Sequence, residues 1–134
     1  MTPSTVILEA LESFLRSGLG GARENLAGVD GLVAYQTKIA ANLLSMLRRE
    51  QELAPALASW DQKLAVHAKL ATDTKVLEGI AVALRDGRLE ADDALIGLLR
   101  QRTLTRLQID NPRYSGCVQA EQRWSRVGEE LMKN

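Results

Sequence analysis

Apolar residues recur at helical spacing in the first half of the chain and predict two helices there. The first helix follows Thr2-Pro3-Ser4, which can cap and start it, and carries apolar positions from Val6 to Leu15. Gly18, Gly20 and Gly21 end this helix, and we expect irregular chain up to about Asp30. The second helix, from about Asp30 to Leu53, carries a broad apolar stripe of Leu32, Val33, Ile39, Ala40, Leu43, Leu44 and Leu47.

Punctuating residues predict the helices of the second half. Pro55 predicts a break and a restart, because proline lacks the N–H of a helix interior; the third helix then ends before Asp73. Asp73 is the expected N-cap of a fourth helix that Asp86-Gly87 stops. A fifth helix runs from about Glu90 to Asn111-Pro112, and a last one covers about 118–132.

The pattern contains no segment with the two-residue period of a strand. The chain has 134 residues, a length typical of one domain, and short connections favour antiparallel neighbours. We therefore predict an all-α fold: one domain over residues 1–134, an antiparallel helical bundle of five to six helices.

Charge and composition exclude several function classes. Lys and Arg together number 17, as do Asp and Glu, so the chain lacks the basic surplus expected of a nucleic-acid-binding protein. The chain has a single histidine and a single cysteine, too few for a Cys/His metal site. It contains no P-loop, GxGxxG or HExxH motif, so we expect no cofactor. No apolar run approaches membrane-span length and no signal-peptide pattern opens the chain, so we expect a cytoplasmic protein without membrane contact.

A few polar residues fall on the apolar sides of predicted helices. Helical steps place Gln36 and Glu50 within the stripe of the second helix, and Arg100 towards the apolar side of the fifth. A buried charge needs a partner, so we predict a Glu50–Arg100 pair. A structural ion pair is the favoured interpretation; a ligand-binding or acid/base carboxylate is the alternative. Glu50 also lies near the end of the predicted helix, where it could reach solvent.

Other polar groups have a structural and a functional interpretation. Tyr35, Lys38, Asn42 and Arg49 share one flank of the second helix, either as a solvated border, which we favour, or as the wall of a groove. A second group consists of four arginines, Arg100, Arg102, Arg106 and Arg113. These arginines could bind an anionic ligand. We favour the alternative that they form an exposed face neutralised by Asp92, Asp93 and Asp110.

The single histidine and the single cysteine are both expected to be structural. His67 has no catalytic partner identifiable by spacing. Cys117 follows a glycine at a helix start, so a reactive thiol is the alternative to a small apolar side chain.

Two segments resemble a bacterial family of domains of unknown function. Lys38-Ile39-Ala40-Ala41-Asn42-Leu43-Leu44 with Arg49-Glu50 is similar to its "RVAANxL…RE" helix, with Lys-Ile in place of Arg-Val. Leu99-Arg100 and the later Asp110-Asn111-Pro112-Arg113-Tyr114 resemble its "LR…DNPRY" ending, and Ala83 to Leu89 resembles "IRxGxL". The resemblance covers about residues 5–115 and leaves the helix at about 118–132 as an addition.

The resemblance implies a helical domain and a set of matching polar residues, but no activity. Its genes lie beside those of aminoglycoside-phosphotransferase-like kinases and acyl-CoA dehydrogenases, which implies an accessory role. The candidate site residues are Asn42, Arg49, Glu50, Arg100, Asp110, Asn111, Arg113 and Tyr114. Asp110 and Asn111 are expected to cap the turn, and Arg113 and Tyr114 to anchor the chain on the bundle.

The leading hypothesis is a non-catalytic interaction protein that docks on such a kinase or dehydrogenase, or on itself as a homo-oligomer. It predicts an exposed apolar patch, with Trp60 or Trp124 as candidate members. The alternative is a small domain, which could be an enzyme, that binds an anionic ligand such as a CoA ester through the arginine cluster.

Overall fold

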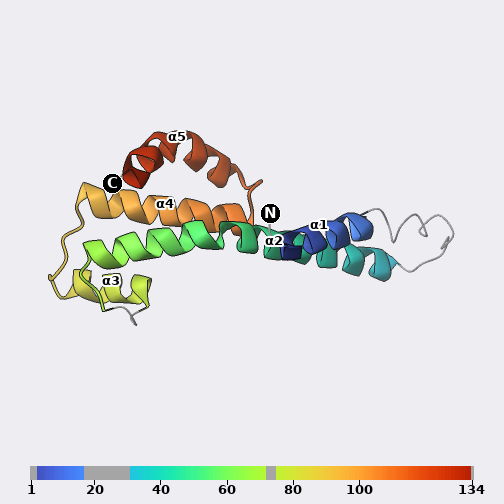
Figure 1. Cartoon of the computed structure of the whole chain (residues 1–134), viewed down its shortest axis with the longest axis horizontal. Helices are drawn as coiled ribbons and strands as arrows, with labels where there is room; N and C mark the ends of the chain where they lie inside the picture. Colours follow the sequence, from blue (N-terminus) through green and yellow to red (C-terminus); the bar gives the residue numbers. More distant parts are fainter. Residues whose placement is uncertain (1–2, 17–30, 72–74, 134) are drawn as a thin grey trace. The chain divides into compact units, whose positions relative to one another are not determined.

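The computed structural model describes residues 3–16, 31–71 and 75–133, apart from the side chains of residues 3, 32 and 125–132. Two predictions fall outside these ranges: the irregular segment between Gly18 and Asp30, and the helix cap at Asp73. The described residues form five helices and no strand, which confirms the predicted all-α helical-bundle class (Figure 1). The helices are α1 (Pro3–Arg16), α2 (Gly31–His67), α3 (Val76–Arg85), α4 (Asp93–Asp110) and α5 (Ser115–Met132).

The break predicted at Pro55 is wrong, because α2 continues through it for a total of 37 residues. A proline inside a helix removes one hydrogen bond and costs about 3 kcal/mol relative to alanine. The neighbours Ala54, Ala56 and Ala58 favour helix strongly. Trp60 and Leu64 are buried in the core just beyond, and their burial offsets the local cost of the proline.

The turn signals of the second half are largely confirmed. Gly87 has a positive φ of 73° directly after α3, as the left-handed end of a helix requires. Asp92 caps α4 through a 2.7 Å hydrogen bond from the Leu95 N–H to its carboxylate, so α4 begins slightly later than the predicted Glu90. Asn111 ends α4 at the predicted place, and α5 then begins at Ser115.

The chain divides into two compact units, residues 1–53 and 54–134, and α2 contributes to both. In the second unit, large apolar side chains from three helices form a core. Its buried members are Trp60, Leu64, Ile80, Leu95 and Leu98. A smaller cluster of Leu104, Cys117 and Ala120 packs α5 along α4 (Figure 1). The buried position of Trp60 contradicts its predicted place in an exposed patch.

The first unit pairs α1 with the beginning of α2 in antiparallel orientation. Glu12 contacts Arg48, whereas Arg16, one turn later in α1, contacts Asn42, earlier in α2. The buried residues of this unit are small or polar, namely Thr5, Ala41 and Ser45. The pair therefore packs through its small residues and not through its apolar stripes.

Gln36 and Glu50 are exposed, so the prediction that they face a core is wrong. The stripe in which they lie is indeed present on α2, but Ile39 and Leu43 in the same stripe are also exposed. Helical periodicity correctly groups these residues on one side of α2. It does not reveal that α1 packs on a different side.

Among the described residues, no helix is long and apolar enough to cross a membrane.

Candidate functional site

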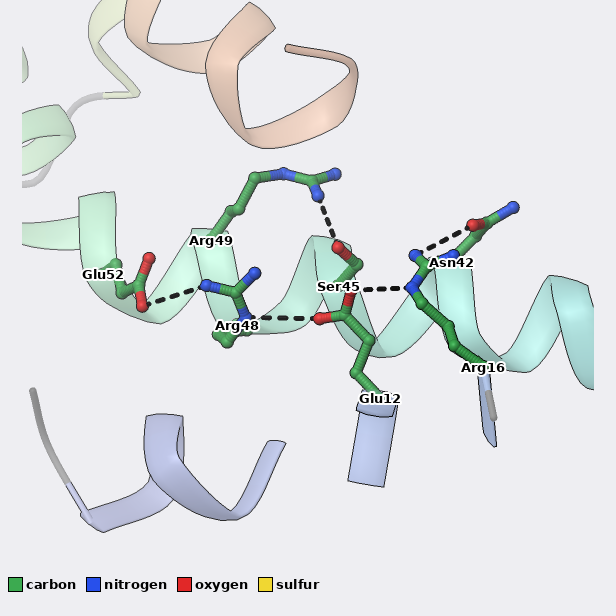
Figure 2. Close-up of polar contacts among 7 residues, drawn as sticks. All are labelled: Glu12, Arg16, Asn42, Ser45, Arg48, Arg49 and Glu52. Carbon is green, nitrogen blue, oxygen red and sulfur yellow. Dashed lines mark hydrogen bonds and ion pairs between the residues drawn. The ribbon is translucent and has the colours of Figure 1, made fainter. Parts of the chain in front are cut away.

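The first unit contains a cluster of polar side chains centred on Glu12 of α1, whose carboxylate accepts hydrogen bonds from two arginines (Figure 2). Its Oε1 accepts a 3.0 Å hydrogen bond from Arg16 Nε, and its Oε2 accepts one of 3.3 Å from Arg48 Nε. The side chain of Glu12 is only 13% exposed, whereas that of Arg16 is 44% exposed. The cluster therefore links the two helices through a largely buried acid.

Three residues of α2 extend this Glu12 cluster along the helix (Figure 2). Asn42 Oδ1 accepts a 3.3 Å hydrogen bond from Arg16 Nη2, and Ser45 Oγ accepts one of 2.8 Å from Arg49 Nη1. Glu52 Oε1 accepts a 3.3 Å bond from Arg48 Nη1. Arg48 thus lies between two carboxylates, one on each helix.

The electrostatics of the cluster favour its charged forms. Burial alone would raise the pKa of Glu12, but hydrogen bonds from Arg16, Ser45 and Arg48, with the Arg48 charge, lower it below 4.5 overall. Burial likewise opposes the charge of Arg48, yet Glu12 and Glu52 raise the pKa of Arg48. Both groups therefore remain charged at neutral pH.

A carboxylate held in this way is poorly suited to acid/base chemistry. A general base works best with a pKa near the operating pH, and the pKa of Glu12 is displaced in the opposite direction. Within the described ranges, no three His, Cys, Asp or Glu side chains are placed to hold a metal ion. The Glu12 cluster is best explained as a polar cross-link that sets the register of α1 against α2.

Large apolar side chains lie on the outer side of the same two helices. Ile7, Leu11 and Phe14 of α1 are 60%, 45% and 50% exposed, and Ile39, Leu43 and Leu47 of α2 are 40%, 54% and 49% exposed. We call these six residues the apolar face. Its exposure is the property that the interaction hypothesis predicts, although it lies in the first unit and contains neither tryptophan.

A comparison with known protein families identifies the family of this chain. The profile of a domain of unknown function, DUF6285, matches residues 27–114, about two thirds of the chain. The chain belongs to this family. No curated protein and no solved structure matches it.

The DUF6285 match begins just before α2 and ends with the turn before α5. It contains the α2 half of the Glu12 cluster, including Asn42 and Arg49, but not α1. The helix α5 also lies outside the match, which begins at residue 27 and not at about residue 5.

Glu50 and Arg100, the central pair of the prediction, are both exposed. Glu50 belongs to the first unit and Arg100 to the second, where its guanidinium lies 5.6 Å from the centre of the Trp124 ring. Their expected burial is therefore wrong, because Arg100 extends over the indole instead of into the α4 core. The pairing itself stays a prediction.

Two other arginines of the predicted cluster, Arg102 and Arg106, have acidic neighbours. Arg102 Nε donates to Asp61 of α2, and Arg106 Nε donates to Asp110 at 3.1 Å, one turn along α4. The predicted neutralisation is thus correct for Asp110. Asp92 serves another purpose, because it caps α4 and contacts His67.

The turn from Asp110 to Tyr114 joins α4 to α5 by backbone hydrogen bonds. The Asn111 N–H donates to the Leu107 carbonyl at 2.8 Å, and the Tyr114 N–H donates to the Asn111 carbonyl at 3.1 Å. Asn111 therefore caps α4 as expected. Arg113 and Tyr114 are exposed, and a Cβ added at Gly116 would lie 2.5 Å from Tyr114 Cε1, so this ring covers the start of α5. Their anchoring role stays a prediction.

His67 and Cys117 have the environments of structural residues. His67 Nε2 lies 3.2 Å from Asp92 Oδ1, a partner that sequence spacing did not reveal. Cys117 is 1% exposed, and burial, together with the charge of Glu121, raises the pKa of its thiol. A raised pKa and lack of access both oppose the reactive-thiol interpretation.

Sequence reasoning missed Glu12, Arg16, Ser45, Arg48 and Glu52. A signal was present, because Glu12 and Arg16, like Arg48 and Glu52, are four residues apart and can pair on one helix face. Such spacing is common on solvated helices, so it could not indicate that the two pairs meet.

Proposed function

We propose that this DUF6285 protein is a non-catalytic interaction protein. The observation that carries the proposal is the apolar face, six large side chains exposed on two adjacent helices. Scattered apolar residues on a surface are ordinary, but a contiguous patch of this kind is typical of protein-binding surfaces.

The polar groups of the chain support a non-catalytic role. Glu12 is engaged by two arginines, and Arg102 and Arg106 each pair with an aspartate. The alternative, an anionic ligand such as a CoA ester, needs these arginines to exchange their aspartates for the ligand. Arg100 instead lies over the Trp124 ring, with its guanidinium 5.6 Å from the ring centre.

The proposed class of partner enzyme is supported by the family resemblance in the sequence and not by any surface of the structure. It favours an aminoglycoside-phosphotransferase-like kinase or an acyl-CoA dehydrogenase, with the interaction taking place in the cytoplasm.

Affinity capture of the full chain from its native cells, followed by mass spectrometry, tests this proposal. We expect one of the two enzyme classes to be enriched over a control without the tagged chain. Calorimetry with a CoA ester tests the alternative at the same time. Saturable CoA-ester binding that is lost in Arg102→Met, without capture of either enzyme, would overturn the proposal.

A further inference from the structure

The long helix α2 crosses the boundary between the two compact units. The first unit ends at Leu53 and the second begins at Ala54, while α2 continues as one helix from Gly31 to His67 (Figure 1). Pro55 lies within two residues of this boundary. The division follows the packing of the chain and not the residue type, so the boundary and the proline are two separate observations that fall at the same place.

The stretch of α2 around Pro55 contributes no buried side chain. Ser45 is the last residue of α2 that is buried in the first unit, and Trp60 is the first that is buried in the second. All residues between them, 46–59, are exposed or half-buried. This stretch is about four helical turns long. Most of the stability of a helix in a protein comes from packing of its apolar side, so these turns rely mainly on their own backbone hydrogen bonds.

Pro55 removes one of those backbone hydrogen bonds. A residue inside an α-helix donates its N–H to the carbonyl four residues earlier, which for position 55 is the carbonyl of Gln51. Proline has no N–H, and its ring crowds that carbonyl, which is why sharp bends in helices are commonly found at proline. Gln51 is exposed, so water can bind its carbonyl when this turn opens. The helix is therefore least resistant to bending within the stretch that lacks buried side chains.

Polar contacts hold α2 within each unit on either side of this stretch. In the first unit, Arg48 of α2 donates to Glu12 of α1. In the second unit, Asp61 of α2 accepts from Arg102 of α4. Residues 53–59 lie between these two contacts and have no charged side chain, so they cannot form an ion pair of their own. Each end of α2 is thus fixed to its own unit, and the turn at Pro55 lies between the two fixed ends.

We propose that α2 bends reversibly at Pro55, so that this turn is a hinge between the two units. Hinges are commonly a few residues that absorb a backbone change while the parts on either side stay rigid. Here the change is an opening of the turn from Gln51 to Pro55, and the Glu12 cluster and the core around Trp60 each move as one body. Motions of this kind take place in microseconds to milliseconds.

A hinge at this place lets the first unit meet a partner at more than one angle to the second unit. The inference goes beyond the proposed function, because it concerns a motion within the chain that needs no partner. It can therefore be tested on the isolated full chain.

Backbone residual dipolar couplings of the weakly aligned full chain test the hinge by nuclear magnetic resonance. The magnitude of alignment is fitted separately to the helical residues of each unit. A rigid chain, whether α2 is straight or bent, has one magnitude, whereas a hinge averages the couplings of one unit more than those of the other. We expect the two magnitudes to differ by at least about 20% in the natural chain, because bends at proline commonly exceed about 20°.

Pro55→Ala restores the missing N–H and should bring the two magnitudes to within about 10% of each other. Pro112→Ala is the matched control, because Pro112 is an exposed proline in the turn between α4 and α5, and we expect it to leave the difference unchanged. Circular dichroism verifies that both variants keep their helices.

A single magnitude of alignment in the natural chain overturns the proposal. A difference that survives in Pro55→Ala, or that disappears in Pro112→Ala, also overturns it. None of these outcomes depends on the capture of an enzyme, so the hinge and the proposed function fail or stand separately.

Discussion

The two units of the molecule use similar helices to very different effect. In residues 54–134, Trp60, Leu64 and Leu95 are almost completely buried among three helices. In the described part of residues 1–53, many large apolar side chains, such as Ile7 and Leu43, are about half exposed, and Ala41 and Ser45 are buried. Two helices can pair but cannot enclose a core, because enclosure requires a further layer. The first unit thus provides a surface, whereas the second provides stability.

Thiol protection gives the largest expected contrast between the units. Cys117, buried in the second unit, should react with a thiol reagent at least about 1,000-fold more slowly than an accessible cysteine, because reaction requires opening of the core. A Ser45→Cys variant in a Cys117→Ala background should be protected less than about 100-fold, as its unit lacks large buried side chains. Equal protection of the two thiols would remove the distinction between the units.

Truncation of the second core should have the largest effect on folding stability. Leu64→Ala removes a side chain with 0% exposure and should lower the free energy of unfolding by about 2–5 kcal/mol. Urea denaturation measures this loss, which should not depend on protein concentration. Leu43→Ala in the first unit should instead lower the free energy of unfolding by less than about 1 kcal/mol, because Leu43 is 54% exposed. Losses of the same size for the two variants would contradict the comparison.

The Glu12 cluster should contribute less, and in a pH-dependent way. Arg48→Met keeps the aliphatic part of the side chain and removes the charge, with an expected loss of about 1 kcal/mol at neutral pH. Because the pKa of Glu12 is lowered in the folded state, its contribution is present above its ordinary value of 4.5 and is lost as the pH falls through the folded pKa.

Urea denaturation of Arg48→Met and the natural chain at several pH values checks this expectation. The difference between them should shrink as Glu12 becomes protonated. Lys38→Met, an exposed charge on the same helix, serves as the control and should show little change. A difference that stays constant down to acid pH would show that Glu12 does not mediate the effect.

The contact of Arg100 with Trp124 should have the smallest effect. Arg100→Ala removes an exposed cation–π contact and should lower stability by about 0.5 kcal/mol. Tryptophan fluorescence during urea denaturation records both the stability and the surroundings of Trp124. A loss above about 2 kcal/mol would indicate that Arg100 has the structural role first assigned to its pair with Glu50.

Local signals along the chain were sufficient for most of the helix plan. Asp86-Gly87 and Asn111-Pro112 ended their helices as predicted. Gly87 adopts a positive φ that stops a helix, and a proline disfavours helical geometry at the residue before it. Both effects depend on the local backbone alone. Pro55 is a local signal that failed. Its effect is limited to one hydrogen bond, and the packing of Trp60 and Leu64 beyond it favours a continuous helix.

The candidate site was only partly accessible to sequence reasoning. Asn42 and Arg49 were selected by their place on α2, but their partners Arg16 and Ser45 were not. The Arg16–Asn42 contact joins residues 26 positions apart, so it depends on which sides of two helices meet, and helical spacing carries no information about that choice. Ser45 lies one turn from Arg49 on α2, so its partner was within reach of helical spacing.

The sequence by itself determined that the chain is helical, where most helices end, and which residues share a side of each helix. These properties depend on backbone geometry and on neighbours within one or two turns. Only the tertiary structure decided that α1 and α2 pack through Thr5, Ala41 and Ser45, so that Glu12 is enclosed and the apolar face is exposed. The physical reason is that an amphipathic stripe can be covered by its own chain or by another, and its periodicity is the same in both cases.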